Sequence, residues 1–112
     1  MTQENNDLIA EFMGGKFSHP HWSLPKTGRW TQDKLQYHKS WDWLMPVVDK
    51  IESLNDTKGD PYRFTITMYD ASIKGTDIEI LGDAYYEGSE QKIVSTYQAV
   101  LEFIKYYNNG RK

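Results

Sequence analysis

The chain has 112 residues, a formal net charge of −3 and no cysteine, with 38% hydrophobic and 14% aromatic residues. This length fits a single packed domain over residues 1–112, and the lack of cysteine excludes disulfides and cysteine-bound zinc. The acidic balance argues against general nucleic-acid binding, and no apolar run is long enough to span a membrane. The first residues, MTQENNDL, do not read as a secretory signal, so we expect a cytoplasmic protein.

A short first helix is predicted in NNDLIAEFMGGK, with Asn5 or Asn6 as its cap. Its apolar residues recur at helical spacing, which gives the helix one buried face. Gly14 and Gly15 should end the helix, because glycine accepts the left-handed conformation of a C-cap.

A long connection of about residues 17–39 follows, interrupted by Pro20, Pro25 and Gly28. Long connections in compact domains tend to be either functional or disordered. Since this one contains Trp22 and Trp30, we expect an ordered loop held down by aromatic side chains, in which a short edge strand can form.

The second helix is predicted in SWDWLMPVVDKIESLN, with a buried stripe that includes Leu44, Val48 and Ile51. Pro46 conflicts with a helix interior, because proline has no N–H and crowds the preceding turn. A start between Ser40 and Asp42 resolves the conflict, and a longer helix kinked at Pro46 is the alternative.

Two strands are predicted next, over residues 62–69 and 76–81, because apolar and polar residues alternate there. Residues 70–76 are interpreted as the turn between them, and residues 84–86 are a candidate third strand. Ser89 should cap a last helix that runs to about Asn108. The chain is therefore predicted to be a small α+β sandwich, in which helices pack on a two- or three-stranded antiparallel meander.

Three segments resemble a family of short, uncharacterised proteins from bacterial and phage-like genome regions: LIAEFMGGK, SWDWLMPVVDKIES and TYQAVLEFIKYYN. The layout is similar to that of the phage α-β-α sandwich domain. The resemblance implies this fold and a mobile-element context, but it implies no activity, cofactor or catalytic residue.

All four tryptophans and all three histidines lie between His19 and Trp43, which makes this part of the chain the candidate site. Trp41 and Trp43 are two residues apart, about 200° around a helix, so both cannot face the core. One of them must meet the long connection, a partner or water. We predict a ligand or partner site formed by His19, His21, Trp22, Trp30, His38, Trp41 and Trp43.

Two histidines, His19 and His21, would point the same way in an extended segment and could hold a metal with His38 or Asp42. Local spacing places only two of these ligands, so a surface loop is the simpler interpretation. No metal or other cofactor is assigned to the chain.

Catalytic motifs are missing from the sequence. The GGK at Gly14–Lys16 lacks the remaining residues of a phosphate-binding loop, and no serine lies in a G-x-S-x-G elbow. Carboxylates gather in the predicted turns, where aspartates usually bond their own backbone. These carboxylates are Asp70, Asp77, Asp83 and Glu87.

The sequence therefore favours a non-catalytic binding module that recognises a protein or a small planar ligand through its aromatic loop. One alternative is a small metal-dependent hydrolase that uses His19, His21 and His38. Another, which rests on the resemblance alone, is a phage inhibitor of host defence that sequesters a nucleotide signal. A homodimer through the outer faces of the helices, with Tyr106 and Tyr107 extending the interface, is also considered.

Overall fold

The structure is a computed structural model that describes residues 2–25, 28–56, 58–68, 70–76, 78–82 and 90–109. In these residues the chain forms three α-helices, one short 3-10 helix and two three-stranded antiparallel sheets, which confirms the α+β class. The elements in chain order are α1 (Thr2–Phe12), β1 (Lys16–Ser18), β2 (His21–Leu24), β3 (Gly28–Thr31), η1 (Gln32–Lys34), α2 (Trp41–Glu52), β4 (Arg63–Ile66), β5 (Ala71–Lys74), β6 (Glu79–Gly82) and α3 (Gln91–Asn108).

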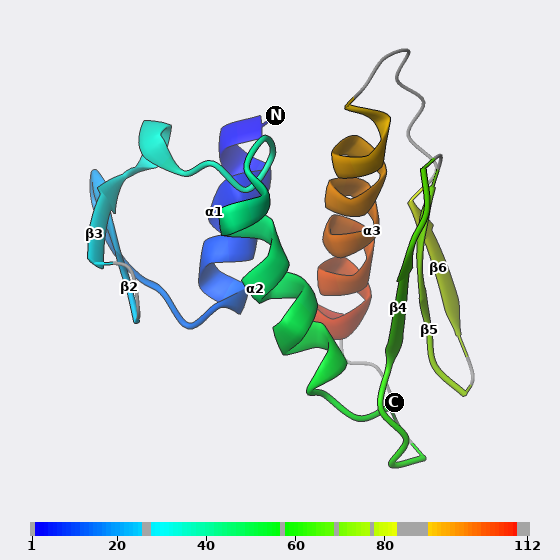
Figure 1. Ribbon diagram of the computed structural model, residues 1–112. Coiled ribbons are helices and arrows are strands. Elements are labelled where there is room, and N and C mark those ends of the chain that lie inside the picture. The colour runs from blue at the N-terminus through cyan, green and yellow to red at the C-terminus, as the bar shows by residue number, and fades with distance from the viewer. Residues whose placement is uncertain are drawn as a thin grey trace.

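Helix α3 lies at the centre of the arrangement (Figure 1). It packs on β5 and β6 on one side, and α1 and α2 contact it as well. The sheet β1–β3 lies beyond α1, far from the sheet β4–β6 (Figure 1). The core therefore runs through the helices, with a small sheet at each end.

The first helix begins earlier than predicted, at Thr2, and Asn6 is not its cap. Asn6 lies inside the helix with only 2% of its surface exposed, where it bonds to residues from other elements. The predicted end is confirmed: Gly14 has a φ of +87°, and the nitrogens of Gly14 and Gly15 bond to the carbonyls of Glu11 and Ala10. This is the Schellman pattern that a left-handed glycine permits.

The segment predicted as a long loop contains a sheet instead. Strand β2 pairs with β1 and β3 on its two sides, and Trp22 of β2 lies opposite Trp30 of β3. Pro20 lies in the turn between β1 and β2, and Pro25 follows the end of β2. The two prolines lie at turns of a meander. From the sequence alone, their spacing looked like that of one irregular loop.

The second helix starts where the sequence predicted, with Ser40 at the N-cap position and Trp41 as its first residue. Pro46 lies in the second turn and is exposed. It has no N–H to donate to the carbonyl of Asp42, so the helix lacks one backbone hydrogen bond on this side.

The C-terminal sheet is a meander of three strands in the order β4-β5-β6. The prediction of a turn over residues 70–76 was wrong, because Ala71–Lys74 forms the central strand β5. Ile73 of β5 pairs with Phe64 of β4 and Ile80 of β6, and this face packs on α3. The predicted strand at residues 84–86 and the predicted cap Ser89 lie outside the described residues.

Helix α3 approaches the C-terminal sheet very closely at Gly82 of β6. A β-carbon on Gly82 would collide with the carbonyl oxygen of Ser95 and lie 2.8 Å from the nitrogen of Ala99. Ser95 and Ala99 are themselves fully buried and small. Glycine is therefore required here so that α3 can lie against the sheet.

We predict that Gly82→Ala lowers the free energy of unfolding by about 2 kcal/mol or more, because α3 must move away from β6. Gly59→Ala is the control, since Gly59 has a φ of +87° but open space around it. It should cost only about 1 kcal/mol, from the strained backbone. Urea denaturation measures both values, and an equal or smaller loss for Gly82→Ala would contradict the close approach.

Candidate functional site

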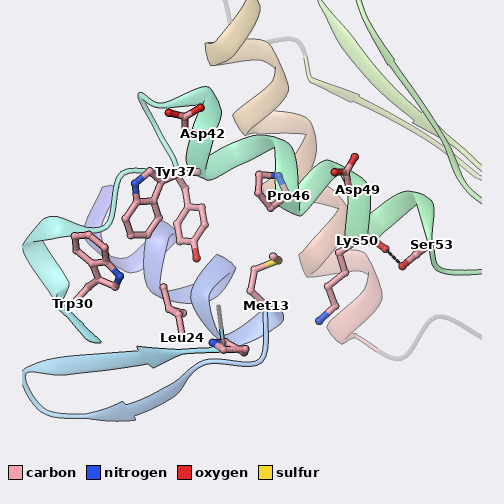
Figure 2. Close-up of a pocket in the computed structure, with 11 residues that line it drawn as sticks. Met13, Leu24, Trp30, Tyr37, Asp42, Pro46, Asp49, Lys50 and Ser53 are labelled. Carbon is pink, nitrogen blue, oxygen red and sulfur yellow. Dashed lines mark hydrogen bonds between the residues drawn. The ribbon is translucent and has the colours of Figure 1, made fainter. Parts of the chain in front are cut away.

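A groove of about 660 Å³ lies between α2 and the N-terminal sheet with the segment that follows it. Figure 2 shows Trp30 and Tyr37 at one end, Pro46, Asp49 and Lys50 along α2, and Leu24 and Met13 on the opposite side. Its lining residues are Met13, Leu24, Pro25, Trp30, Tyr37, Asp42, Trp43, Pro46, Asp49, Lys50 and Ser53.

Aromatic rings form one end of this groove. The ring of Trp43 meets Trp30 with centroids 5.0 Å apart and an interplanar angle of 73°. It meets Tyr37 at 5.1 Å and 90°. Trp43 is thus the tryptophan of α2 that faces the segment before the helix, whereas Trp41 is partly buried against the core and does not line the groove. These edge-to-face contacts fix the rings without filling the space between the sheet and α2.

Tyr37 supplies a polar atom among these rings. Its side chain is only 3% exposed, and burial raises the pKa of its hydroxyl to about 12. The hydroxyl points toward the side of the groove where Leu24 and Met13 lie (Figure 2). At neutral pH Tyr37 therefore keeps its proton and can donate a hydrogen bond inside the groove.

Charged side chains line the α2 side of the groove. Asp42, Pro46, Asp49 and Ser53 follow one another at steps of three and four residues, so they share one face of the helix. The amino group of Lys50 donates to the carbonyl of Phe12 and lies 4.7 Å from the centroid of the Phe12 ring. Lys50 is thereby held at the C-terminal end of α1, where a cation is favoured.

Trp22 anchors the N-terminal sheet and does not line the groove. Its indole is 6% exposed, and Nε1 donates to Oδ1 of Asp7 over 2.8 Å. The other oxygen of the same carboxylate accepts a hydrogen bond from Nε2 of Gln32 over 2.9 Å. Asp7 of α1 therefore holds both β2 and η1, and Trp22 acts in packing.

His38 belongs to a buried polar network around Asn6. Nδ2 of Asn6 donates to the carbonyl of Leu35 over 3.1 Å and lies 3.0 Å from Nδ1 of His38. The hydroxyl of Tyr97 donates to Oδ1 of Asn6 over 2.9 Å. The carbonyl of Leu35 can only accept, so the side-chain amide of Asn6 must direct its NH2 group toward it. Nδ1 of His38, which meets the same NH2 group, must therefore be an acceptor. This network connects α1, the segment before α2, and α3.

The other two histidines lie apart from this network. His19 is exposed in the turn between β1 and β2, where its ring lies 5.9 Å from that of Phe17, and His21 begins β2. Within the described ranges, which include all three histidines and Asp42, no three His, Asp or Glu side chains are grouped so that they could hold a metal ion.

The predicted turn carboxylates are only partly described. Asp70 accepts a hydrogen bond from the hydroxyl of Thr67 over 2.7 Å within its own turn. Asp77, Asp83 and Glu87 lie outside the described residues. Of the two tyrosines considered for a homodimer, Tyr107 stacks on Phe103 at 5.8 Å, and Tyr106 is half-buried against the core.

Asp56 is a buried acid that the sequence interpretation overlooked. Its carboxylate accepts hydrogen bonds from the backbone nitrogens of Thr76, Lys58 and Asp60, over 2.7, 2.9 and 3.0 Å. These bonds, that of Thr76 first, hold the pKa of Asp56 far below its usual range. They close the turn before β4 against the turn after β5. A second hollow of about 310 Å³ beside Asp56 is therefore part of a structural turn.

Several groove residues were not predicted from the sequence to belong to a site, among them Met13, Tyr37, Pro46 and Asp49. One sequence signal for the α2 side was available: Asp42, Asp49 and Ser53 fall on the face of α2 opposite its buried stripe. The aromatic end gave no such signal for Tyr37, because its burial depends on how β3 leads into α2.

No family model matches the chain, and no curated protein or solved structure is significantly similar to it. In the part of the chain that the structure describes, every helix is too short or too polar to cross a bilayer. The resemblance to phage-associated proteins therefore stays an expectation from three sequence segments.

We predict that His38 makes the protein less stable in mild acid. Desolvation, with a smaller effect from Lys39, lowers the pKa of His38 from its ordinary 6.5. The unfolded chain thus takes up a proton more readily than the folded one. The stability that neutral His38 contributes should be fully present above pH 6.5. It should fall as the pH drops from 6.5 to the lower pKa of the folded state, and then level off.

Urea denaturation at about pH 7.5 and about pH 5.5 measures this loss, with His38→Gln as the control. Glutamine can still accept from Asn6 but does not titrate. The unmodified protein should lose more stability on acidification than the variant. Equal losses in the two proteins would show that His38 is not the group responsible.

Proposed function

We propose that this protein is a non-catalytic binding module that takes its ligand into the groove between α2 and the N-terminal sheet. The observation that carries the proposal is the meeting of Trp30, Tyr37 and Trp43 at one end of a groove of about 660 Å³. Ligand sites are commonly concave, mainly apolar and aromatic, with a few polar groups that fix orientation. Tyr37 and the charged side chains of α2 are such groups.

The polar atoms of the groove support binding over covalent catalysis. The hydroxyl of Ser53 donates to the carbonyl of Lys50 over 2.6 Å, and the amino group of Lys50 donates to the carbonyl of Phe12. A nucleophile needs a general base within hydrogen-bond reach, and each of these groups is directed to a backbone oxygen instead.

The alternative of a metal-dependent hydrolase has less support. Nδ1 of His38 accepts from Asn6, on the inner side of the segment before α2, whereas His19 and His21 belong to the hairpin of β1 and β2. A mobile-element context remains compatible with a binding module, and the proposed role of the groove does not depend on it.

We predict that ligands shift the NMR signals of the groove tryptophans, Trp30 and Trp43. Short peptides of random sequence and, separately, adenosine are titrated into isotope-labelled protein, and the indole N–H signals are followed. Trp43→Leu should weaken binding at least about tenfold, because buried aromatic anchors dominate such sites. Trp41→Leu removes a similar ring from the same helix outside the groove, so it should bind like the unmodified protein.

Loss of binding in both variants would indicate a general effect on α2 and not a groove contact. Unchanged signals of Trp30 and Trp43 with every peptide and with adenosine, in protein that remains folded, would contradict the proposed function.

A further inference from the structure

We propose that the ligand of the groove is a basic, extended segment of a partner protein, bound with arginine or lysine side chains against Asp42 and Asp49. This inference rests on the proposed binding function and names the chemistry of the partner.

The α2 side of the groove carries negative charge that has no partner in the described part of the chain. Asp42 and Asp49 are both exposed, and neither carboxylate forms an ion pair or hydrogen bond with another residue in the described part of the chain. The basic residue that lines the groove, Lys50, donates to the carbonyl of Phe12. The α2 side of the groove therefore offers the carboxylates of Asp42 and Asp49 to a ligand, and a cation is the complementary group.

The aromatic rings favour the same kind of ligand. A guanidinium or ammonium group is attracted to the face of an indole ring, and arginine also stacks on it. Trp30 and Trp43 provide two such rings at an angle of 73°, and the hydroxyl of Tyr37 can donate to a backbone carbonyl of the segment.

The distance between Asp42 and Asp49 favours an extended chain segment over a small cation as the ligand. Asp42 and Asp49 are seven residues apart in α2, which is about 10 Å along the helix axis. Figure 2 shows both carboxylates on the same side of α2, with Pro46 between them. Three residues of extended chain cover about the same distance. A single ammonium group would reach one carboxylate and leave most of the groove empty.

Charge also disfavours ligands that carry phosphate, including a nucleotide signal. A phosphate in this groove would lie near Asp42 and Asp49, and like charges repel. Lys50 could meet it only by giving up its contacts with Phe12. The net charge of −3 adds a weak long-range preference for basic partners.

The test uses the full chain and three end-capped peptides of equal length that alternate glycine with arginine, citrulline or glutamate. Citrulline keeps the shape of arginine without its charge. The arginine peptide should shift the indole signals of Trp30 and Trp43 and bind in the micromolar range, whereas the other two should bind at least about tenfold more weakly. Salt should weaken the arginine peptide, because the carboxylates are exposed.

Variants on α2 locate the effect. Replacing both Asp42 and Asp49 by asparagine should weaken the arginine peptide about tenfold and leave the citrulline peptide unchanged. Glu52→Gln makes the same kind of charge change at an exposed position of α2 outside the groove, so it should have almost no effect. Equal losses in the double variant and Glu52→Gln would overturn the inference.

Two further results would also overturn it. Tight binding of the citrulline or glutamate peptide, or of adenosine, would show a groove that binds without selecting positive charge, and the proposed function would stand. Arginine amide that binds as tightly as the arginine peptide would identify a small cation as the ligand. If none of these probes shifts Trp30 or Trp43, the inference and the proposed function both fail.

Discussion

The carboxylate of Asp7 holds the N-terminal sheet against the helices. It accepts from the indole of Trp22 and the amide of Gln32, so one residue of α1 bonds to both β2 and η1. A sheet whose strands have three or four residues has little core of its own and depends on a neighbour for stability. Trp22 and Leu24 bury their side chains in the same core cluster as the apolar residues of the helices, and Asp7 adds a direct hydrogen bond from α1 to Trp22.

The groove depends on this attachment. Leu24 and Trp30 come from the attached sheet, and Tyr37 comes from the segment that leads to α2. Asn6, the residue next to Asp7, holds that segment through Leu35 and His38. Two adjacent side chains of one helix thus determine where the aromatic rings meet α2. A site that is formed in advance loses less conformational freedom when a ligand enters.

Much of the fold could be predicted from the sequence. The end of α1, the start of α2 and the end of α3 follow from glycine, serine and apolar spacing, and β4 and β6 follow from alternation. Strand β5 was missed because four residues between Asp70 and Gly75 look like a turn until their pairing with β4 and β6 is known. The N-terminal sheet was missed because prolines that end strands also interrupt loops.

The site could be located only in part. Sequence spacing showed that Trp41 and Trp43 face different directions, and the structure places Trp43 with Trp30 in the groove. Trp22 was grouped with them, yet its partner Asp7 is 15 residues away and no local pattern identifies it. Asn6 looked like a helix cap for the same reason, since its partners Leu35, His38 and Tyr97 are distant in sequence.

Hydrogen exchange in Asp7→Asn tests most directly whether Asp7 holds the sheet in place. An asparagine amide keeps one acceptor oxygen but presents a donor where Asp7 presents its second, so it cannot bond both Trp22 and Gln32 as observed. Glu11→Gln on the exposed side of α1 is the control. The account predicts faster exchange of the β2 and β3 amides in Asp7→Asn, with β4–β6 unchanged. Exchange in β2 and β3 as slow as in the control would contradict it.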